Sequence, residues 1–263
     1  MRMRLLRSAS LITALPLALV AAGGPLASAA DESAKSPRQV LTDLSRDLGK
    51  VRNYHFSGSQ TDPDGRSSLA GDATASGRAN LQIRKGASAV RLIAVPAGVY
   101  IKGNAAYWKS VGGSNGASIA KQLADRWVKA PGSQDKSLVA MFQDLTPKHL
   151  ASCTAVGTGT LAKGGTATIA GRKAVVIVDR GDKPGTTPGR LYVTASGPVL
   201  PLRVTQTGRR RAGGHLDTRC QEKDDKSTAS DLTFSRFDAP LKIAAPHGAI
   251  TLPSGGGGTG TPA

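Results

Sequence analysis

The sequence predicts an α+β fold in which β-strands follow one another along the chain. Three strand-like runs stand close together at 173–179, 190–195 and 199–206. Leu191 and Val193 alternate with polar residues, which places them on one face of a sheet. Turns rich in Gly and Pro separate the runs, as in an antiparallel meander. Strands that run consecutively, instead of alternating with helices, are typical of the α+β class.

An amphipathic helix precedes the first strand. Ser36 is a good N-cap, Pro37 suits the first turn, and Gln39 can complete a capping box. The residues that follow place leucine and valine side chains four apart, which forms one apolar stripe along a helix. We expect this stripe to pack on the sheet; it consists of Val40, Leu44 and Leu48.

The rest of the chain supplies further strands and two helical patches. Alternating apolar and polar residues predict strands at 53–60, 73–84, 89–94, 98–102 and 231–237. Helical spacing appears at about 117–125 and 136–145, and the segment 241–252 is a candidate edge strand. The sum is about nine to eleven strands, one N-terminal helix and one or two central helices.

The N-terminal 30 residues have the pattern of a secretory signal peptide. Three arginines precede a short apolar run at 11–20, and Ala27-Ser28-Ala29 supplies the small residues of a cleavage site. Cleavage after Ala29 or Ala30 fits equally well. We therefore expect an exported protein of the cell envelope, with one domain over 31–253 and a disordered Gly/Thr/Pro-rich tail at 254–263. No cysteine lies near the cleavage point, so no lipid anchor is expected.

The two cysteines, Cys153 and Cys220, favour a disulfide in an exported chain. A bridge between them would stabilise the fold by about 4 kcal/mol in the chain-entropy model. Two free buried thiols are the alternative. No histidine or cysteine spacing typical of zinc occurs, and no nucleotide-binding motif, so we expect no metal and no cofactor.

The chain is strongly basic, with a formal net charge of +17. Three of these cations lie in the predicted leader, which leaves +14 on the mature chain. Outside the cell the available anions are lipid headgroups and cell-wall polymers, so these are the candidate partners and nucleic acid is not. Solubility alone is the competing explanation. The one dense cluster, 209–211, is expected to be a solvated loop.

One motif could indicate catalysis. The segment Gly112–Gly116 matches G-x-S-x-G, which in α/β-hydrolases presents a nucleophilic serine, here Ser114. The fold lacks the alternation of strands and helices that such a sheet requires, and no histidine is singled out as the base. We therefore interpret the segment as a flexible loop and predict that the protein is not an enzyme, with a hydrolase as a remote alternative.

Several short segments together resemble the LppX/LprAFG-type lipoproteins of actinobacteria, which belong to the LolA-like superfamily. The resemblance covers roughly residues 36–252. It lies in the order of the elements and in the motifs NYHFSG at 53–58, VYIKG at 99–103 with YW at 107–108, DRWVK at 125–129, AGRKAV at 170–175 and LPLRV at 200–204. This chain lacks the lipobox cysteine that such lipoproteins usually carry.

The resemblance implies a curved antiparallel half-barrel whose concave apolar face is closed by helices over a cavity for acyl chains. It implies a non-enzymatic, monomeric carrier of a lipid or another hydrophobic small molecule. The alternative is an envelope protein with a filled core that binds a partner or a wall polymer. The candidate cavity residues are Val40, Leu44, Leu48, Phe56, Leu81, Ile83, Ile101, Leu138, Phe142, Leu191, Val193 and Leu202.

Overall fold

The structure is a computed structural model that describes residues 31–214, 217, 219–220 and 226–251, without the side chains of 132–137. The predicted signal peptide and the predicted disordered tail lie outside these residues. Twelve strands form one curved, unclosed sheet in the order β12-β6-β5-β4-β3-β2-β1-β11-β10-β9-β8-β7. Every neighbouring pair is antiparallel except β12 and β6.

The strand bounds follow the chain through two meanders. The strands are β1 Asn53–Asp62, β2 Gly65–Thr74, β3 Ala79–Lys85, β4 Ser88–Val95, β5 Gly98–Gly103, β6 Val128–Lys129, β7 Leu161–Ile169, β8 Arg172–Asp179, β9 Gly189–Thr194, β10 Pro201–Gln206, β11 Ala229–Ser235 and β12 Ile250–Thr251. The first meander comprises β1 to β5 and the second β7 to β11. They join where β11 pairs with β1, placing Phe234 opposite Phe56.

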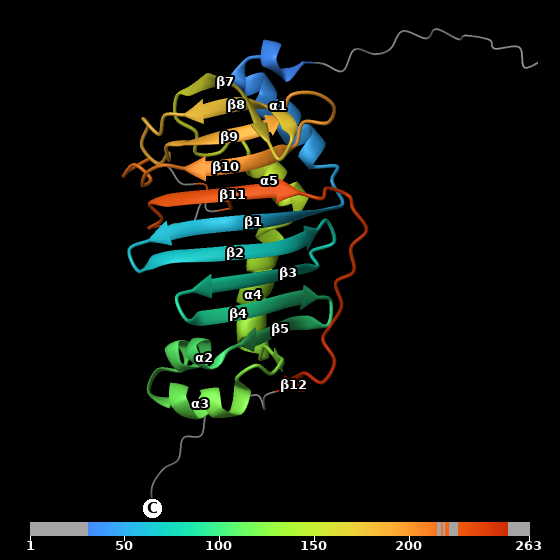
Figure 1. The fold of residues 1–263 in the computed structure, drawn as a ribbon, viewed down its shortest axis with the longest axis vertical. Coiled ribbons are helices and arrows are strands. Elements are labelled where there is room, and N and C mark those ends of the chain that lie inside the picture. The colour runs from blue at the N-terminus through green and yellow to red at the C-terminus, as the bar shows by residue number, and fades with distance from the viewer. Residues whose placement is uncertain (1–30, 215–216, 218, 221–225, 252–263) are drawn as a thin grey trace, which may run out of the picture.

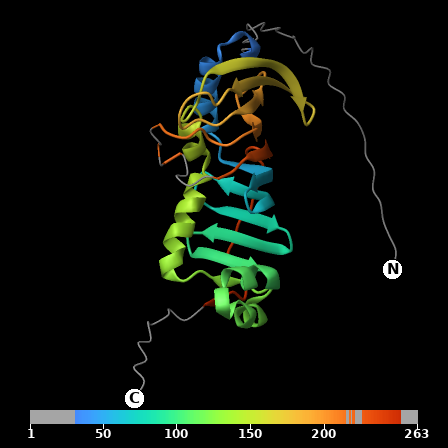
Figure 2. The same cartoon turned by 90° about the vertical axis from the view of Figure 1, so that its left-hand side faces the viewer.

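Helices cover one face of the sheet. In Figures 1 and 2, α1, α5 and α4 form a column along this face, while α2 and α3 lie at the β5 end. The helices are η1 Glu32–Ala34, α1 Pro37–Leu48, α2 Ala105–Val111, η2 Gly113–Asn115, α3 Gly116–Leu123, α4 Gly132–Asp144 and α5 Pro147–Cys153. No helix in the described part of the chain is long and apolar enough to cross a membrane. The predicted α+β half-barrel with helices over its concave face is confirmed.

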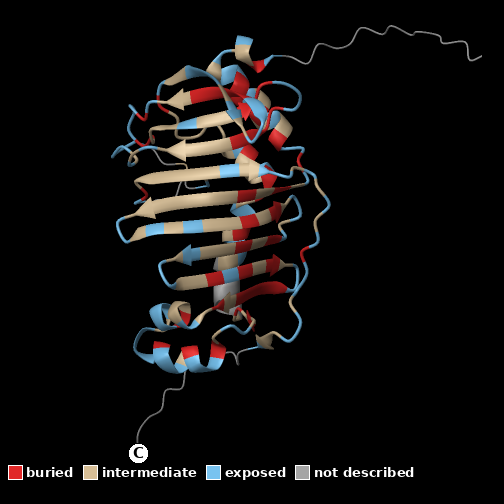
Figure 3. Ribbon diagram, in the orientation of Figure 1, coloured by how far each residue is buried: buried red, intermediate tan, exposed pale blue. Residues whose placement is uncertain are grey.

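The buried residues form two clusters on this helix-covered face. One lies between β1–β6 and the helices α2, α3 and α4, and it contains most of the buried rings. The other lies between α1, α5 and the strands β8 and β9, and its buried members are valine, leucine, alanine and isoleucine. Figure 3 shows buried positions in strands of both meanders. We call these two regions the aromatic half and the aliphatic half.

Several sequence predictions need correction. The described part of the chain has four central helices, α2 to α5, instead of one or two. The predicted single strand over 73–84 is wrong, because the chain turns back between β2 and β3, where Gly77 has a left-handed φ of 77°. The sheet has twelve strands instead of nine to eleven, because the predicted strands do not separate β2 from β3 and do not include β6 or β7. The predicted alternation through 199–206 is interrupted by a register shift between Pro201 and Arg203.

Candidate functional site

A cavity of about 370 Å³ lies under α1 and α5 in the aliphatic half. It is partly open to solvent. Its apolar lining comes from the helices α1 and α5 and from the strands β7 to β11, where Phe234 lies at the border with the aromatic half. These residues are Leu41, Leu44, Leu48, Leu150, Leu161, Ile177, Leu191, Pro201, Val204 and Phe234.

The helix α1, which forms one wall of the cavity, begins where the sequence predicts. The Ser36 Oγ accepts a hydrogen bond from the backbone N–H of Gln39, and the Gln39 side chain accepts one from the Ser36 N–H at 2.9 Å. This capping box stabilises the first turn. The apolar stripe then faces the sheet, with Val40, Leu44 and Leu48 all buried.

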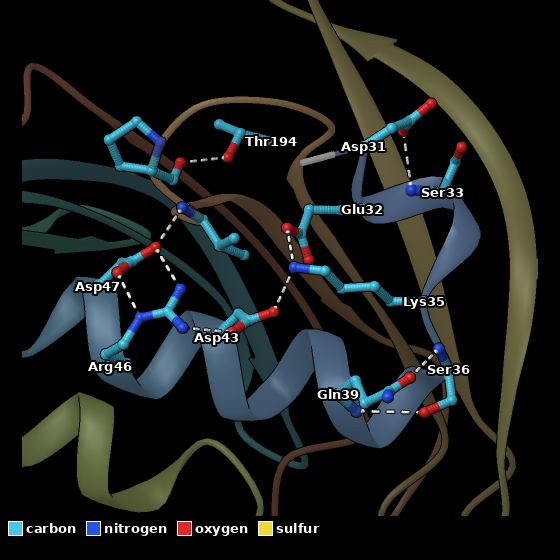
Figure 4. A network of polar contacts seen from close by, with 12 residues as sticks. Asp31, Glu32, Ser33, Lys35, Ser36, Gln39, Asp43, Arg46, Asp47 and Thr194 are labelled. Carbon is cyan, nitrogen blue, oxygen red and sulfur yellow. Dashed lines mark hydrogen bonds and ion pairs between the residues drawn. The ribbon is translucent and has the colours of Figure 1, made fainter. Parts of the chain in front are cut away.

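A polar network holds α1 against the hairpin between β9 and β10, as Figure 4 shows. The Lys35 Nζ donates to Glu32 Oε1 and to Asp43 Oδ2, at 2.6 Å each. The Arg46 guanidinium donates to Asp43 Oδ1 at 2.6 Å and to Asp47 Oδ1 at 2.9 Å. The other Asp47 oxygen accepts from the backbone N–H of Val199 at 3.0 Å, which connects the helix to the sheet.

The network shifts the acid–base properties of its members. The hydrogen bonds from Arg46, opposed by partial burial, lower the pKa of Asp47 from 3.8 to about 2. The hydrogen bond from Lys35 likewise lowers the pKa of Asp43. Both carboxylates therefore remain charged at neutral pH and keep α1 in place over the cavity.

The helix α5 forms the next part of the roof. Ser45 on α1 donates its hydroxyl to the backbone carbonyl of Ala151 at 2.7 Å, which joins the two helices. The disulfide between Cys153 and Cys220 then fixes the end of α5 to the connection between β10 and β11. The predicted disulfide is confirmed. The His149 Nε2 lies 3.5 Å from the Cys153 sulfur, but the bonded cysteines offer no thiolate to a metal.

Two of the polar residues at the cavity already have partners inside the protein. Asp179 accepts hydrogen bonds from the backbone N–H groups of Gly159 at 3.1 Å and Gly181 at 2.8 Å. Gln206 donates to the backbone carbonyls of Gly208 and Ser227, at 2.8 and 3.0 Å. These groups do not need a ligand to satisfy them, so the site suits a predominantly apolar guest.

In the aromatic half of the same face, the described side chains of sheet and helices form one buried cluster. Phe142 of α4 is 1% exposed and packs among Tyr54, Phe56 and their neighbours. The Tyr54 hydroxyl donates to the carbonyl of Leu145 at 2.6 Å, which holds the α4–α5 junction on β1, and burial raises the pKa of this phenol. The roof therefore lies close to the sheet at this end.

The twelve predicted cavity residues divide between the two halves. Leu44, Leu48 and Leu191 line the cavity. Val40 and Val193 are buried beside it in the aliphatic half. Leu202, at the register shift between Pro201 and Arg203, is buried but does not line the cavity. The remaining six lie in the aromatic half, namely Phe56, Leu81, Ile83, Ile101, Leu138 and Phe142. That any of the twelve contacts a ligand stays a prediction.

Several lining residues were not identified from the sequence. Leu150 lies on α5, where the sequence indicates only a short turn after Pro147. Leu161 lies on β7 and Ile177 on β8. The antiparallel pairing of these two strands brings both residues to the cavity under α1. Ile177 could have been found, because it falls in the apolar run of the predicted strand at 173–179.

The G-x-S-x-G segment lies between α2 and α3, whereas the cavity lies under α1 and α5. Ser114 is exposed in η2, the single turn that joins α2 to α3. Among the described residues, no hydrogen bond joins Ser114 to a histidine, and the cavity lining includes no part of this turn. The segment forms a short helical turn, so the prediction of a flexible loop is wrong about its conformation.

Comparison with known proteins finds similar structures but no matching family model and no matching curated protein. LprF from Mycobacterium bovis is 13% identical, with a TM-score of 0.48 over 83% of this chain and 98% of that one. Lipoprotein LppX from Mycobacterium tuberculosis is 16% identical, with a TM-score of 0.44 over 80% of this chain and 100% of that one. The MucA/MucB complex of Pseudomonas aeruginosa gives 16% identity and a TM-score of 0.35, over 81% and 59%. LprF and LppX are of the type that the sequence resembles. At these values the similarity carries no argument about function.

Proposed function

We propose that this protein binds a hydrophobic small molecule, a lipid or an acyl chain, in the cavity under α1 and α5. The observation that carries the proposal is the partly open space of about 370 Å³ with leucine and isoleucine side chains on its walls. Because the space is partly open, a guest can enter it from solvent, and its predominantly apolar lining is typical of small-molecule sites.

The size of the cavity favours a guest with one chain. Small-molecule sites commonly range from about 300 to 1,000 Å³, and this one is near the lower limit. Burial stabilises a hydrocarbon chain by about 0.8 kcal/mol for each methylene removed from water. A single acyl chain therefore gains enough free energy to bind, while a lipid with several long chains exceeds the space.

The proposed place of action is outside the cytoplasm. The disulfide between Cys153 and Cys220 supports this location, because such bonds persist mainly in oxidising compartments. The signal-peptide pattern of the N-terminal 30 residues supports it as well. A carrier that moves an apolar molecule through the aqueous envelope needs this combination of export and an apolar interior.

The first test is native mass spectrometry of protein purified without detergent. We expect a co-purified molecule of lipid mass that organic solvent releases. Two results together would overturn the proposal. The protein would carry no such molecule after expression in several hosts, and it would not bind dansyl-labelled undecanoic acid.

A matched pair of variants then places the binding. Leu191→Trp fills the cavity from its floor, and we expect it to weaken binding of the dansyl-labelled acid by about tenfold or more. Val139→Trp adds the same ring on the exposed side of α4 and should leave binding unchanged. Equal binding by both variants would show that the acid binds elsewhere.

The filled aromatic half supports a second candidate, an envelope protein that binds another macromolecule through its surface. In this case the cavity has no physiological guest, and the Leu191→Trp variant retains its cellular function. Complementation of a deletion strain with the two tryptophan variants distinguishes the candidates, because only the carrier proposal predicts that Leu191→Trp fails.

A further inference from the structure

The face of the sheet opposite the helices carries a second, polar hollow. The strands β11, β1, β2 and β3 show this face to the viewer in Figure 1, with α4 and α5 behind them. Side chains alternate across a sheet, so the neighbours of the buried Tyr54 and Phe56 point outward. A hollow of about 590 Å³ lies there, and its lining includes Ser57, Ser59, Ser68, Arg66, Arg84 and Asp231.

The strand register arranges these groups in rows across the sheet. Arg84 lies opposite Ser68, Ser68 opposite Ser59, and Ser59 opposite Asp231. A second row places Arg91 opposite Lys102 on the neighbouring strands β4 and β5. Adjacent strands are about 4.8 Å apart, so hydroxyl groups and cations recur at short, regular intervals across the strands.

The hollow has an excess of positive charge. Asp231, its one acidic lining residue, receives two hydrogen bonds from Arg203, at 2.7 and 2.5 Å, and is thereby neutralised. Arg66 donates a hydrogen bond to the Ser59 hydroxyl at 2.9 Å, and Arg84 lies beside the Gln82 amide. The hydrogen bonds from Arg203, and to a lesser extent the charge of Arg66, lower the pKa of Asp231. Arg66, Arg84 and Arg203 together outnumber the single carboxylate of Asp231, so this part of the face keeps an excess of positive charge.

We infer that this hollow binds a linear polymer that carries repeated phosphate groups, such as a phosphodiester polymer of the cell envelope. Guanidinium groups match the geometry of phosphate oxygens, and serine hydroxyls can donate to the same oxygens. A row of such groups across several strands suits an extended chain with regularly spaced charges. This site is independent of the cavity under α1 and does not rest on the proposed lipid binding.

The composition of the face favours a polymer over a membrane surface. Proteins that bind membranes peripherally usually insert apolar side chains beside their cations. The described exposed large hydrophobic residues are Val111 and Val139, which lie on α2 and α4 and not on this face. The hollow is lined with hydroxyl groups instead, which suits a hydrophilic ligand.

The test is a binding titration of the full chain with lipid-free polyglycerol phosphate. We expect the Arg66→Gln, Arg84→Gln double variant to bind about tenfold more weakly, and its binding to depend less steeply on salt. A matched control, Lys121→Gln with Lys148→Gln, removes the same charge from exposed positions on α3 and α5. The control should retain most of the affinity, and circular dichroism checks that both variants are folded.

Three results would overturn the inference. Equal loss of affinity in the two double variants would show that net charge alone causes binding. Equal affinity for polygalacturonate would show that the site does not select phosphate. The protein could also bind phosphatidylglycerol vesicles more tightly than the polymer, with the same dependence on Arg66 and Arg84. That result would assign the face to a membrane. Tight, phosphate-selective binding lost only in the arginine variant supports the inference.

Discussion

The two halves of the helix-covered face are built on one continuous sheet, and the cavity under α1 and α5 lies in the aliphatic half. In the aromatic half, rings from β1, α2 and α4 meet between sheet and helix, with Phe142 and Tyr54 each 1% exposed. In the aliphatic half, leucine and valine side chains of α1 face aliphatic side chains of β8 and β9. Large rings fill the space under the roof, while shorter side chains leave part of it open. Residue size, more than strand topology, separates the two halves.

The largest expected effect is the loss of a ring from the filled half. Phe142→Ala should lower the free energy of unfolding by about 4 kcal/mol, because it removes a buried ring and leaves a cavity. Leu191→Ala, at a half-buried position beside an existing cavity, should cost about 1 kcal/mol. Urea denaturation measures both. Equal costs would contradict the difference in packing between the halves.

The disulfide should account for the next largest effect. Replacing both cysteines, Cys153→Ser with Cys220→Ser, should lower the free energy of unfolding by about 3 kcal/mol, since the closed loop is long. Dithiothreitol should lower the stability of the wild-type protein by a similar amount and leave that of the double variant unchanged. A reductant effect on the double variant would show that the loss has another cause.

Enlarging one leucine should have opposite effects in the two halves. Leu92→Phe, in the aromatic half, should lower the stability by about 2 kcal/mol through overpacking. Leu161→Phe extends into the cavity and should raise the stability of the ligand-free protein by about 1 kcal/mol. Thermal denaturation of delipidated protein measures both. Destabilisation by both substitutions would indicate that the cavity closes in solution.

The smallest expected effect concerns the network that holds α1. The folded pKa of Asp47, about 2, lies below its unfolded value of 3.8, so the carboxylate stabilises the fold above about pH 4. Asp47→Asn should cost about 1 kcal/mol at neutral pH, discounted for partial exposure. The difference between variant and wild type should vanish as the pH falls from about 4 to about 2.

A matched substitution tests the assignment of this pH dependence. Asp64→Asn changes an exposed carboxylate in the β1–β2 turn and should leave the stability nearly unchanged. Chemical denaturation at a series of pH values compares the three proteins. A constant cost of Asp47→Asn from pH 7 down to pH 2 would show that the charge of Asp47 does not stabilise α1.

Local patterns predicted much of the fold, because they depend on nearby residues. The capping residues Ser36 and Gln39 fixed the start of α1, and period-two alternation located β9. The strand β2 was missed, because Ser67, Ser68 and Gly71 show no clear apolar alternation. The strand β6, which lies between β5 and the edge strand β12, has only two residues, too few for a period to be visible.

The cavity could be anticipated but not located from the sequence. Alternation identifies which face of a strand is apolar, but both halves present apolar faces to the helices. The sequence therefore predicted Phe142 and Leu191 equally as cavity residues. In the structure Phe142 is buried in the aromatic half, and Leu191 lines the cavity. The difference depends on which side chains of distant segments meet between sheet and helix, as Tyr54 of β1 and Leu145 at the end of α4 do.

The most direct test is a crystal structure of the protein soaked with a bromine-labelled fatty acid. We predict one strong anomalous peak between α1 and the strands β8 to β10, close to Leu44 and Leu191. The aromatic half should show none, since Phe142 and its neighbours occupy it. A labelled chain found elsewhere, or a refined structure in which side chains fill the space under α1, would contradict the account.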